Sequence, residues 1–105
     1  MKKETTPWTQ GVLLVCTKCH KAIAPDLLKE EGNAGENLKN YLKQTLKASG
    51  DAAKVRVVTS SCLSVCEPNT QAVAFASVSG VTETWTVHPE LERKELLDYL
   101  LKIKN

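Results

Sequence analysis

The stretch Gly11-Val-Leu-Leu-Val-Cys-Thr-Lys-Cys19 decides the fold of this chain. Its first six residues form a short, continuous apolar run, which is too short for a helix and typical of a strand that is buried on both faces. A cysteine ends this run, and a second cysteine follows after two residues. The stretch therefore predicts a buried strand that leads directly into a Cys-x2-Cys motif.

The remaining elements follow from the spacing of apolar residues. Helical spacing extends from residue 36 to about residue 49 and again from 91 to 103. The region 20–35 contains proline and glycine and predicts a loop, with a turn of helix near residues 26–31. The predicted strands after the first one are the Val-rich runs 55–58, 73–78 and 81–87. The short connection Ser79-Gly80 suits a hairpin between the last two strands.

The predicted order β-α-β-β-β-α is the order of a thioredoxin-like domain, in which a parallel βαβ unit is followed by an antiparallel hairpin and a covering helix. We therefore predict an α/β fold with a single mixed sheet and helices packed on it. Residues 1–105 are expected to form one domain. Residues 1–10 are predicted to be a polar leader that can be flexible.

A second cysteine pair, Cys62-Leu-Ser-Val-Cys66, lies just after the predicted second strand, and the two pairs together hold all four cysteines of the chain. Parallel neighbouring strands end at the same edge of a sheet. We therefore expect Cys16, Cys19, Cys62 and Cys66 to converge on one site.

Composition excludes several classes of function. With 105 residues and 42% apolar residues, the chain can build a modest core without metal or disulfides. The formal charge of +2 and the even mixture of basic and acidic residues argue against a nucleic-acid partner. The polar start and the short apolar run at 12–15 argue against a signal sequence and a membrane span. We therefore predict a cytoplasmic protein, in which paired cysteines serve as metal ligands or redox groups.

The spacing of the cysteines leaves the chemistry of the site open. Four thiolates fit a tetrahedral zinc ion, and two short-spaced pairs also fit the two irons of a [2Fe-2S] cluster. Cys16 and Cys19 alone match a thioredoxin-like thiol-disulfide motif, although this leaves the second pair without a role. His20 is a further potential ligand, as histidines are in Rieske centres, but four cysteines already complete a site. Four incidental buried thiols are the structural alternative.

The motifs Val15-Cys-Thr-Lys-Cys19 and Ser61-Cys-Leu-Ser-Val-Cys66 resemble those of the thioredoxin-like [2Fe-2S] ferredoxins and of the small predicted metal-binding (2Fe-2S) ferredoxin-like proteins. The resemblance implies that Cys16, Cys19, Cys62 and Cys66 ligate one [2Fe-2S] cluster. It also implies a one-electron carrier that is not a complete enzyme and that works with redox partner proteins we do not identify. Related folds often dimerise through the sheet, so the resemblance is compatible with a homodimer.

In the expected mechanism, the protein binds the cluster and provides its surroundings. Backbone N–H groups of the two ligand loops would donate to the sulfurs, and Val15, Leu63 and Val65 would form an apolar floor. Because the first pair lies on a loop at one end of the sheet, we expect a site close to the surface, where a redox partner can approach.

Overall fold

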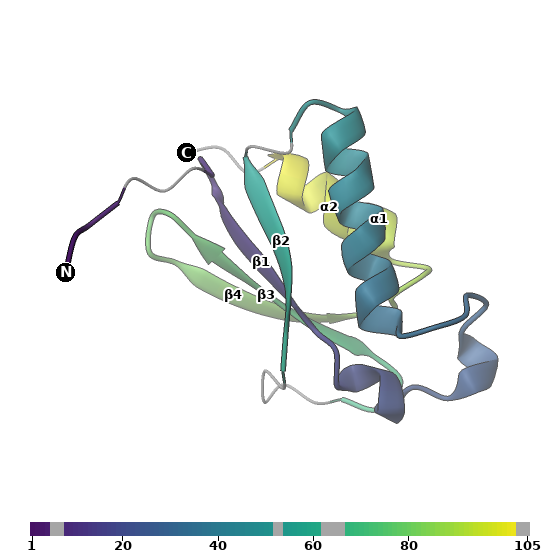
Figure 1. The fold of residues 1–105 in the computed structure, drawn as a ribbon. Coiled ribbons are helices and arrows are strands. Elements are labelled where there is room, and N and C mark those ends of the chain that lie inside the picture. Colours follow the sequence, from purple (N-terminus) through teal and green to yellow (C-terminus); the bar gives the residue numbers. More distant parts are fainter. Residues whose placement is uncertain (5–7, 52–53, 62–66, 103–105) are drawn as a thin grey trace.

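The computed structural model describes residues 1–4, 8–51, 54–61 and 67–102; the side chain of His20 also lies outside this description. The elements are β1 (Gly11–Cys16), η1 (Cys19–Ala22), η2 (Pro25–Leu27), α1 (Ala34–Ala48), β2 (Val55–Ser60), β3 (Gln71–Ser77), β4 (Thr82–Val87) and α2 (Arg93–Lys102), where η denotes a 3₁₀-helix (Figure 1). The predicted order β-α-β-β-β-α is confirmed, with the two 3₁₀-helices added between β1 and α1.

The four strands form one mixed sheet in the order β2-β1-β3-β4. β1 is parallel to β2 and antiparallel to β3, and β3 is antiparallel to β4. The α1 helix provides the crossover that a parallel pair requires. In the register of the parallel pair, Cys16 lies opposite Ser60, so the last residues of both strands are at the same edge of the sheet.

Both helices lie on the same face of the sheet, with α1 beside α2 (Figure 1). The main core fills the space between the helices and the sheet. Its members are Leu13, Val15, Leu38, Leu42, Leu46, Val55, Val57, Val73, Phe75, Leu96, Leu97 and Leu100. The α1 helix contributes Leu38, Leu42 and Leu46, which recur at intervals of four residues along one helical face. The prediction of an α/β fold with helices packed on a single mixed sheet is therefore confirmed.

The α1 helix begins two residues earlier than predicted. Asn33 is its N-cap, and the Asn33 side chain accepts hydrogen bonds from the N–H groups of Gly35 and Glu36. This cap allows the helix to start at Ala34 in spite of the glycine at its second position. At the other end, Gly50 has a φ of 82°, a conformation that suits the residue after a helix.

The α2 helix begins at Arg93 and not at residue 91, because residues 88–92 form a turn that side chains stabilise. The Glu92 carboxylate accepts the N–H of His88 at 2.6 Å. Nδ1 of His88 in turn accepts the N–H groups of Glu90 and Leu91, at 3.1 and 3.0 Å. The last predicted residue of this helix, residue 103, lies outside the described residues.

The helical turn predicted near residues 26–31 is replaced by η2, which ends at Leu27. The next residues are not helical, because the Glu90 carboxylate binds the N–H groups of Lys29 and Glu30. These hydrogen bonds lower the pKa of Glu90, with the Glu30 N–H making the larger contribution. Glu30 also pairs with Arg93 of α2 at 2.6 Å. Of the helices in the described part of the chain, none is both long enough and apolar enough to cross a bilayer.

Candidate metal centre

Cys16 and Cys19 lie together at one end of the sheet. Cys16 is the last residue of β1 and Cys19 is the first residue of η1. Both are buried thiols, with 1% and 6% of their surface exposed, and they cluster with Ala72 of β3. Because side chains alternate along a strand, Val15 faces the helices and Cys16 faces the opposite side of the sheet.

The prediction that Val15 forms the floor of this site is therefore wrong. Val15 belongs to the main core, and Ala72 contacts the two cysteines in its place. The other two residues predicted for the floor, Leu63 and Val65, lie outside the described residues.

Each sulfur atom of the first pair accepts a backbone hydrogen bond. The N–H of Lys18 donates to Sγ of Cys16 at 3.3 Å, and the N–H of Ala72 donates to Sγ of Cys19 at 3.4 Å. Hydrogen bonds from backbone N–H groups to ligand sulfurs are among the contacts that tune metal–thiolate sites. The Lys18 donor comes from the ligand loop, as predicted. The Ala72 donor comes from β3, which sequence reasoning did not identify.

The pairing of β1 with β3 ends just before the cysteines. Val15 and Val73 are the last paired residues, although both strands continue beyond them. At the next position, the Ala72 N–H binds the Cys19 sulfur, and the carbonyl of Cys16 accepts a 2.6 Å hydrogen bond from Nε2 of Gln71. Beyond the last β1–β3 pair, contacts with the cysteine loop therefore take the place of backbone pairing between the two strands.

The N-terminus of α1 also holds this loop. Nδ2 of Asn33 donates to the carbonyl oxygen of Thr17 at 3.0 Å, in addition to the capping bonds of Oδ1. Gly35 packs directly on Cys16, since a Cβ atom at Gly35 would lie 2.5 Å from the Cys16 carbonyl oxygen. Only glycine permits this close approach of helix and strand.

The second pair, Cys62 and Cys66, lies outside the described residues. The chain that enters this segment is held beside the first pair. The carbonyl of Ser60 accepts hydrogen bonds from the N–H and the hydroxyl of Thr17, at 3.0 and 3.2 Å. Thr17 directly follows Cys16, and Ser60 precedes Cys62 by two residues.

The chain that leaves the same segment is also held beside the first loop. Asn69 donates its N–H to the carbonyl of Ala22 at 2.9 Å, and its Oδ1 accepts the N–H of Ala24 at 2.9 Å. Asn69 has a φ of 63°, a left-handed conformation that asparagine adopts more readily than most residues. Both described flanks of segment 62–66 therefore contact the loop that begins at Cys16. Convergence of the four sulfurs themselves stays a prediction.

The described residues alone do not make a complete metal site, because they contain no group of three or more His, Cys, Asp or Glu side chains placed to hold an ion. Two of the four predicted ligands lie outside this part of the chain. The charged residues of the first loop, Lys18 and Lys21, are both exposed.

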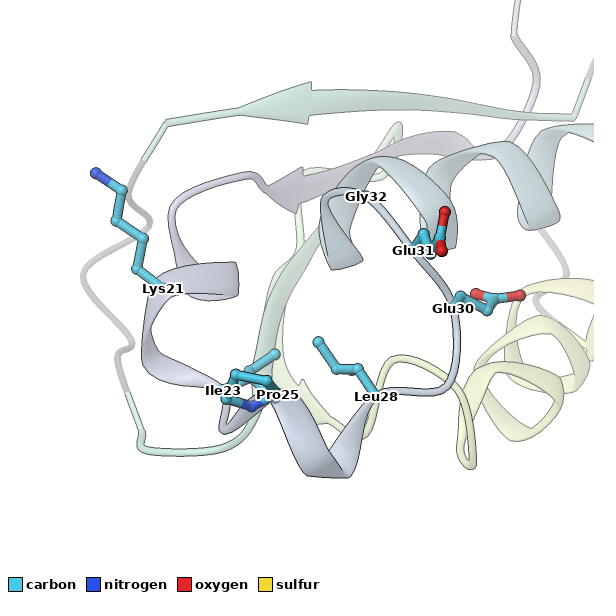
Figure 2. Close-up of a pocket in the computed structure, with 7 residues that line it drawn as sticks. All are labelled: Lys21, Ile23, Pro25, Leu28, Glu30, Glu31 and Gly32. Atoms are coloured by element: carbon cyan, nitrogen blue, oxygen red, sulfur yellow. The ribbon is translucent and has the colours of Figure 1, made fainter.

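A pocket of about 450 Å³ opens beside this loop, between η1, η2 and residues 28–32 (Figure 2). Ile23, Pro25 and Leu28 gather at its centre, whereas Lys21 extends away from them. Glu30 points toward α2, where its partner Arg93 lies. The pocket is lined by Lys21, Ile23, Pro25, Leu28, Glu30, Glu31 and Gly32, and therefore borders the cysteine loop without including a cysteine.

Comparison with known proteins gives a family for this chain. Residues 13–104 match the model of a family described as "Protein of unknown function (DUF1636)". No curated protein and no solved structure matches the chain significantly. The matched region begins inside β1 and extends past the end of α2, and it therefore includes both cysteines of the first pair and every element after β1. The chain belongs to the DUF1636 family.

Proposed function

We propose that this chain is a small [2Fe-2S] protein that carries single electrons, with Cys16, Cys19, Cys62 and Cys66 as the cluster ligands. The observation that supports this function most is that both sulfurs of the first pair accept backbone N–H hydrogen bonds. When bound, such a cluster supplies reversible one-electron transfer at a potential that its surroundings set.

The chain's own residues provide what this role needs. Burial of Cys16 and Cys19 protects the ligands from solvent, and the N–H groups of Lys18 and Ala72 stabilise negative charge on their sulfurs. Lys18 and Lys21 are exposed on the same loop, so the chain presents charged groups to a redox partner close to the ligands. The partner proteins themselves, and a homodimer, remain predictions.

Structural zinc is a second candidate, because the hydrogen bond from Lys18 to the sulfur two residues earlier suits any Cys-x2-Cys metal half-site. Thiol-disulfide exchange is less well supported. It requires an accessible thiolate, usually at the N-terminus of a helix, whereas Cys16 and Cys19 are almost fully buried and the only helix at the motif is the short η1, which begins at Cys19.

Metal analysis distinguishes these functions. We expect protein purified without air to be red-brown and to contain two irons and two acid-labile sulfides per chain. Its visible absorption should be bleached by dithionite, and the reduced protein should give a rhombic EPR signal. Colourless protein with one zinc per chain would contradict the electron-carrier function and support a zinc-stabilised interaction module. Colourless, metal-free protein that reduces a disulfide substrate would support thiol-disulfide exchange.

Substitution of single ligands tests the assignment of the site. Cys16→Ser and Cys62→Ser should each abolish or severely reduce iron retention, because each removes one of four thiolates. Ala22→Ser is a matched control, since it introduces the same side chain at an exposed position of the same loop. Retention of a full cluster by Cys62→Ser would show that the second pair does not ligate it.

A further inference from the structure

The side chain of Gln71 is completely buried, although it belongs to no predicted motif. Its Nε2 group uses both protons, donating to the carbonyl oxygens of Cys16 at 2.6 Å and of Ala72 at 3.0 Å. Its Oε1 atom has no hydrogen-bond partner among the described residues. A buried acceptor without a partner is unfavourable, so a residue of this kind requires an explanation.

The contacts of Gln71 determine the orientation of its amide group. In the opposite orientation, Oε1 would lie against two carbonyl oxygens, and no proton would separate them. The amide nitrogen therefore faces Cys16 and Ala72. This orientation directs both N–H donors of the amide to the carbonyl groups of Cys16 and Ala72. As a consequence, Oε1 is left without a partner among the described residues.

Gln71 and Ala72 are consecutive residues that hold the two ends of the Cys-x2-Cys motif. The Gln71 side chain holds the carbonyl of Cys16, and the Ala72 N–H holds the sulfur of Cys19. The hydrogen bond from Gln71 to the Ala72 carbonyl links the two contacts. These bonds lie at the point where β1 and β3 stop pairing, so they replace the ladder that would otherwise fix the two strands.

We propose that Gln71 is a positioning residue of the cysteine site, which sets the geometry of Cys16 through its carbonyl group and that of Cys19 through Ala72 before a metal binds. Its relevance to iron rests on the proposed function, but its effect on the two thiols is a property of the metal-free chain. Loss of the Gln71 amide should release the Cys16 carbonyl and move the Ala72 N–H away from the Cys19 sulfur. The first pair should then become more accessible and more reactive.

The experiment compares Gln71→Met with Gln10→Met in metal-free, reduced protein. Methionine keeps the length of the side chain and removes the amide. Gln10 is a matched control, because it precedes β1 at the opposite end of the sheet and its Oε1 is also buried without a partner among the described residues. The rate of iodoacetamide alkylation is measured at each cysteine by peptide mass spectrometry, and urea unfolding reports the stability of each variant.

We expect alkylation of Cys16 and Cys19 to be about five- to tenfold faster in Gln71→Met than in the parent chain, as the loss of a typical hydrogen bond predicts. Gln10→Met should leave these rates unchanged. Parent-like rates in Gln71→Met, or equal increases in both variants, would overturn the proposal. If Gln71→Met does not fold, Gln71→Asn replaces it, because its shorter side chain cannot reach both carbonyl groups. Parent-like alkylation rates in Gln71→Asn, or an increase equal to that of Gln10→Met, would then overturn the proposal.

A measurement on metal-loaded protein tests the same residue independently of stability. Gln71→Met should change the visible circular dichroism of the bound metal chromophore, whereas Gln10→Met should not. An unchanged spectrum in Gln71→Met would count against the proposal. If the purified chain holds zinc or no metal, the electron-carrier function fails, but the alkylation rates still decide whether Gln71 positions the thiols.

Discussion

Asn33 donates its side-chain N–H to the carbonyl oxygen of Thr17 at 3.0 Å, while the oxygen of the same amide caps α1. One residue thus connects the crossover helix to the loop between Cys16 and Cys19. The amide nitrogen of Asn33 holds the loop and the amide oxygen caps the helix, so a substitution that changes only one of these atoms tests the two functions individually.

Replacement of Asn33 by aspartate should keep the helix and disturb the cysteine loop. Aspartate caps a helix as well as asparagine does, but it cannot donate to Thr17, and its carboxylate repels that carbonyl. We expect Asn33→Asp to retain the stability of α1 and to lose bound metal faster to a chelator. Asn33→Ala should in addition cost about 1 kcal/mol of unfolding free energy. Urea unfolding measures the stability of the helix, and the rate of metal loss measures the effect on the loop. A parent-like rate of metal loss in Asn33→Asp would show that the N–H of Asn33 does not hold the cysteine loop.

A methyl group at Gly35 should disturb the cysteine site from the helix side. In Gly35→Ala, the new Cβ would lie 2.5 Å from the Cys16 carbonyl oxygen, so backbone has to move. Overpacking of this kind costs about 1–3 kcal/mol, which exceeds the gain of up to about 1 kcal/mol from the better helix former. We expect lower stability together with reduced metal retention.

Gly11→Ala is the matched control for this variant. Its Cβ would clash with the Ala76 carbonyl oxygen and the Phe75 ring, at the opposite end of β1. Both variants should therefore lose stability in urea, but only Gly35→Ala should lose metal at concentrations of urea that leave both folded. Equal metal loss in the two variants would show that the effect is general.

Removal of the metal should leave the fold intact. The main core lies on the helix side of the sheet and its described members include no cysteine, whereas Cys16 and Cys19 cluster with Ala72 on the other side. We expect metal-free protein to keep its far-ultraviolet circular dichroism and a cooperative thermal transition. Leu42→Ala, in contrast, should cost about 2–5 kcal/mol, because Leu42 is fully buried in the core. A metal-free chain without secondary structure would contradict this prediction.

Acid should release the loop that Glu90 holds. The N–H groups of Glu30 and Lys29 lower the pKa of Glu90 below its ordinary value of 4.5. The carboxylate therefore contributes stability above pH 4.5, and this contribution is lost as the pH falls through the lowered pKa of the folded state. Glu90→Gln should be less stable than the parent chain at neutral pH and equal to it in strong acid. The effect should be small, because Glu90 is only partly buried.

The measurement is the urea midpoint as a function of pH, with Glu31→Gln, in the loop that Glu90 holds, as the control. Glu31→Gln removes a charge of the same sign from an exposed neighbour and should shift the midpoint little at any pH. A constant difference between Glu90→Gln and the parent chain over the whole pH range would argue against the hydrogen-bonded carboxylate as its cause.

Much of the fold follows from local sequence. The apolar run at residues 11–16 predicts β1 with its observed bounds, because nothing in it competes with a buried strand. The starts of other elements depend on side chains that act over a distance. Gly35 indicates a loop until Asn33 is recognised as a cap. Leu91 continues the helical spacing of α2, yet it is 77% exposed and lies in the turn that His88 and Glu92 stabilise.

The candidate site is predictable only in part for the same reason. The spacing of the cysteines predicts the ligands, and the parallel pairing of β1 and β2 brings Cys16 opposite Ser60, two residues before the second motif. The groups that hold the first pair come from residues 53 and 55 positions away, Ala72 and Gln71. Neither is a β-branched or aromatic residue of the kind that favours a strand, and their contacts depend on the pairing of β1 with β3, which joins residues far apart in the sequence.

The distance along the chain between Cys19 and Ala72 has a consequence for biosynthesis. These residues are 53 positions apart, so the ribosome produces the first cysteine pair well before the strand that covers it. During this interval the two thiols have neither the N–H of Ala72 nor the side chain of Gln71 as neighbours. The nascent chain is then open to stray metal ions and oxidants, and the arrival of β3 ends this period of exposure.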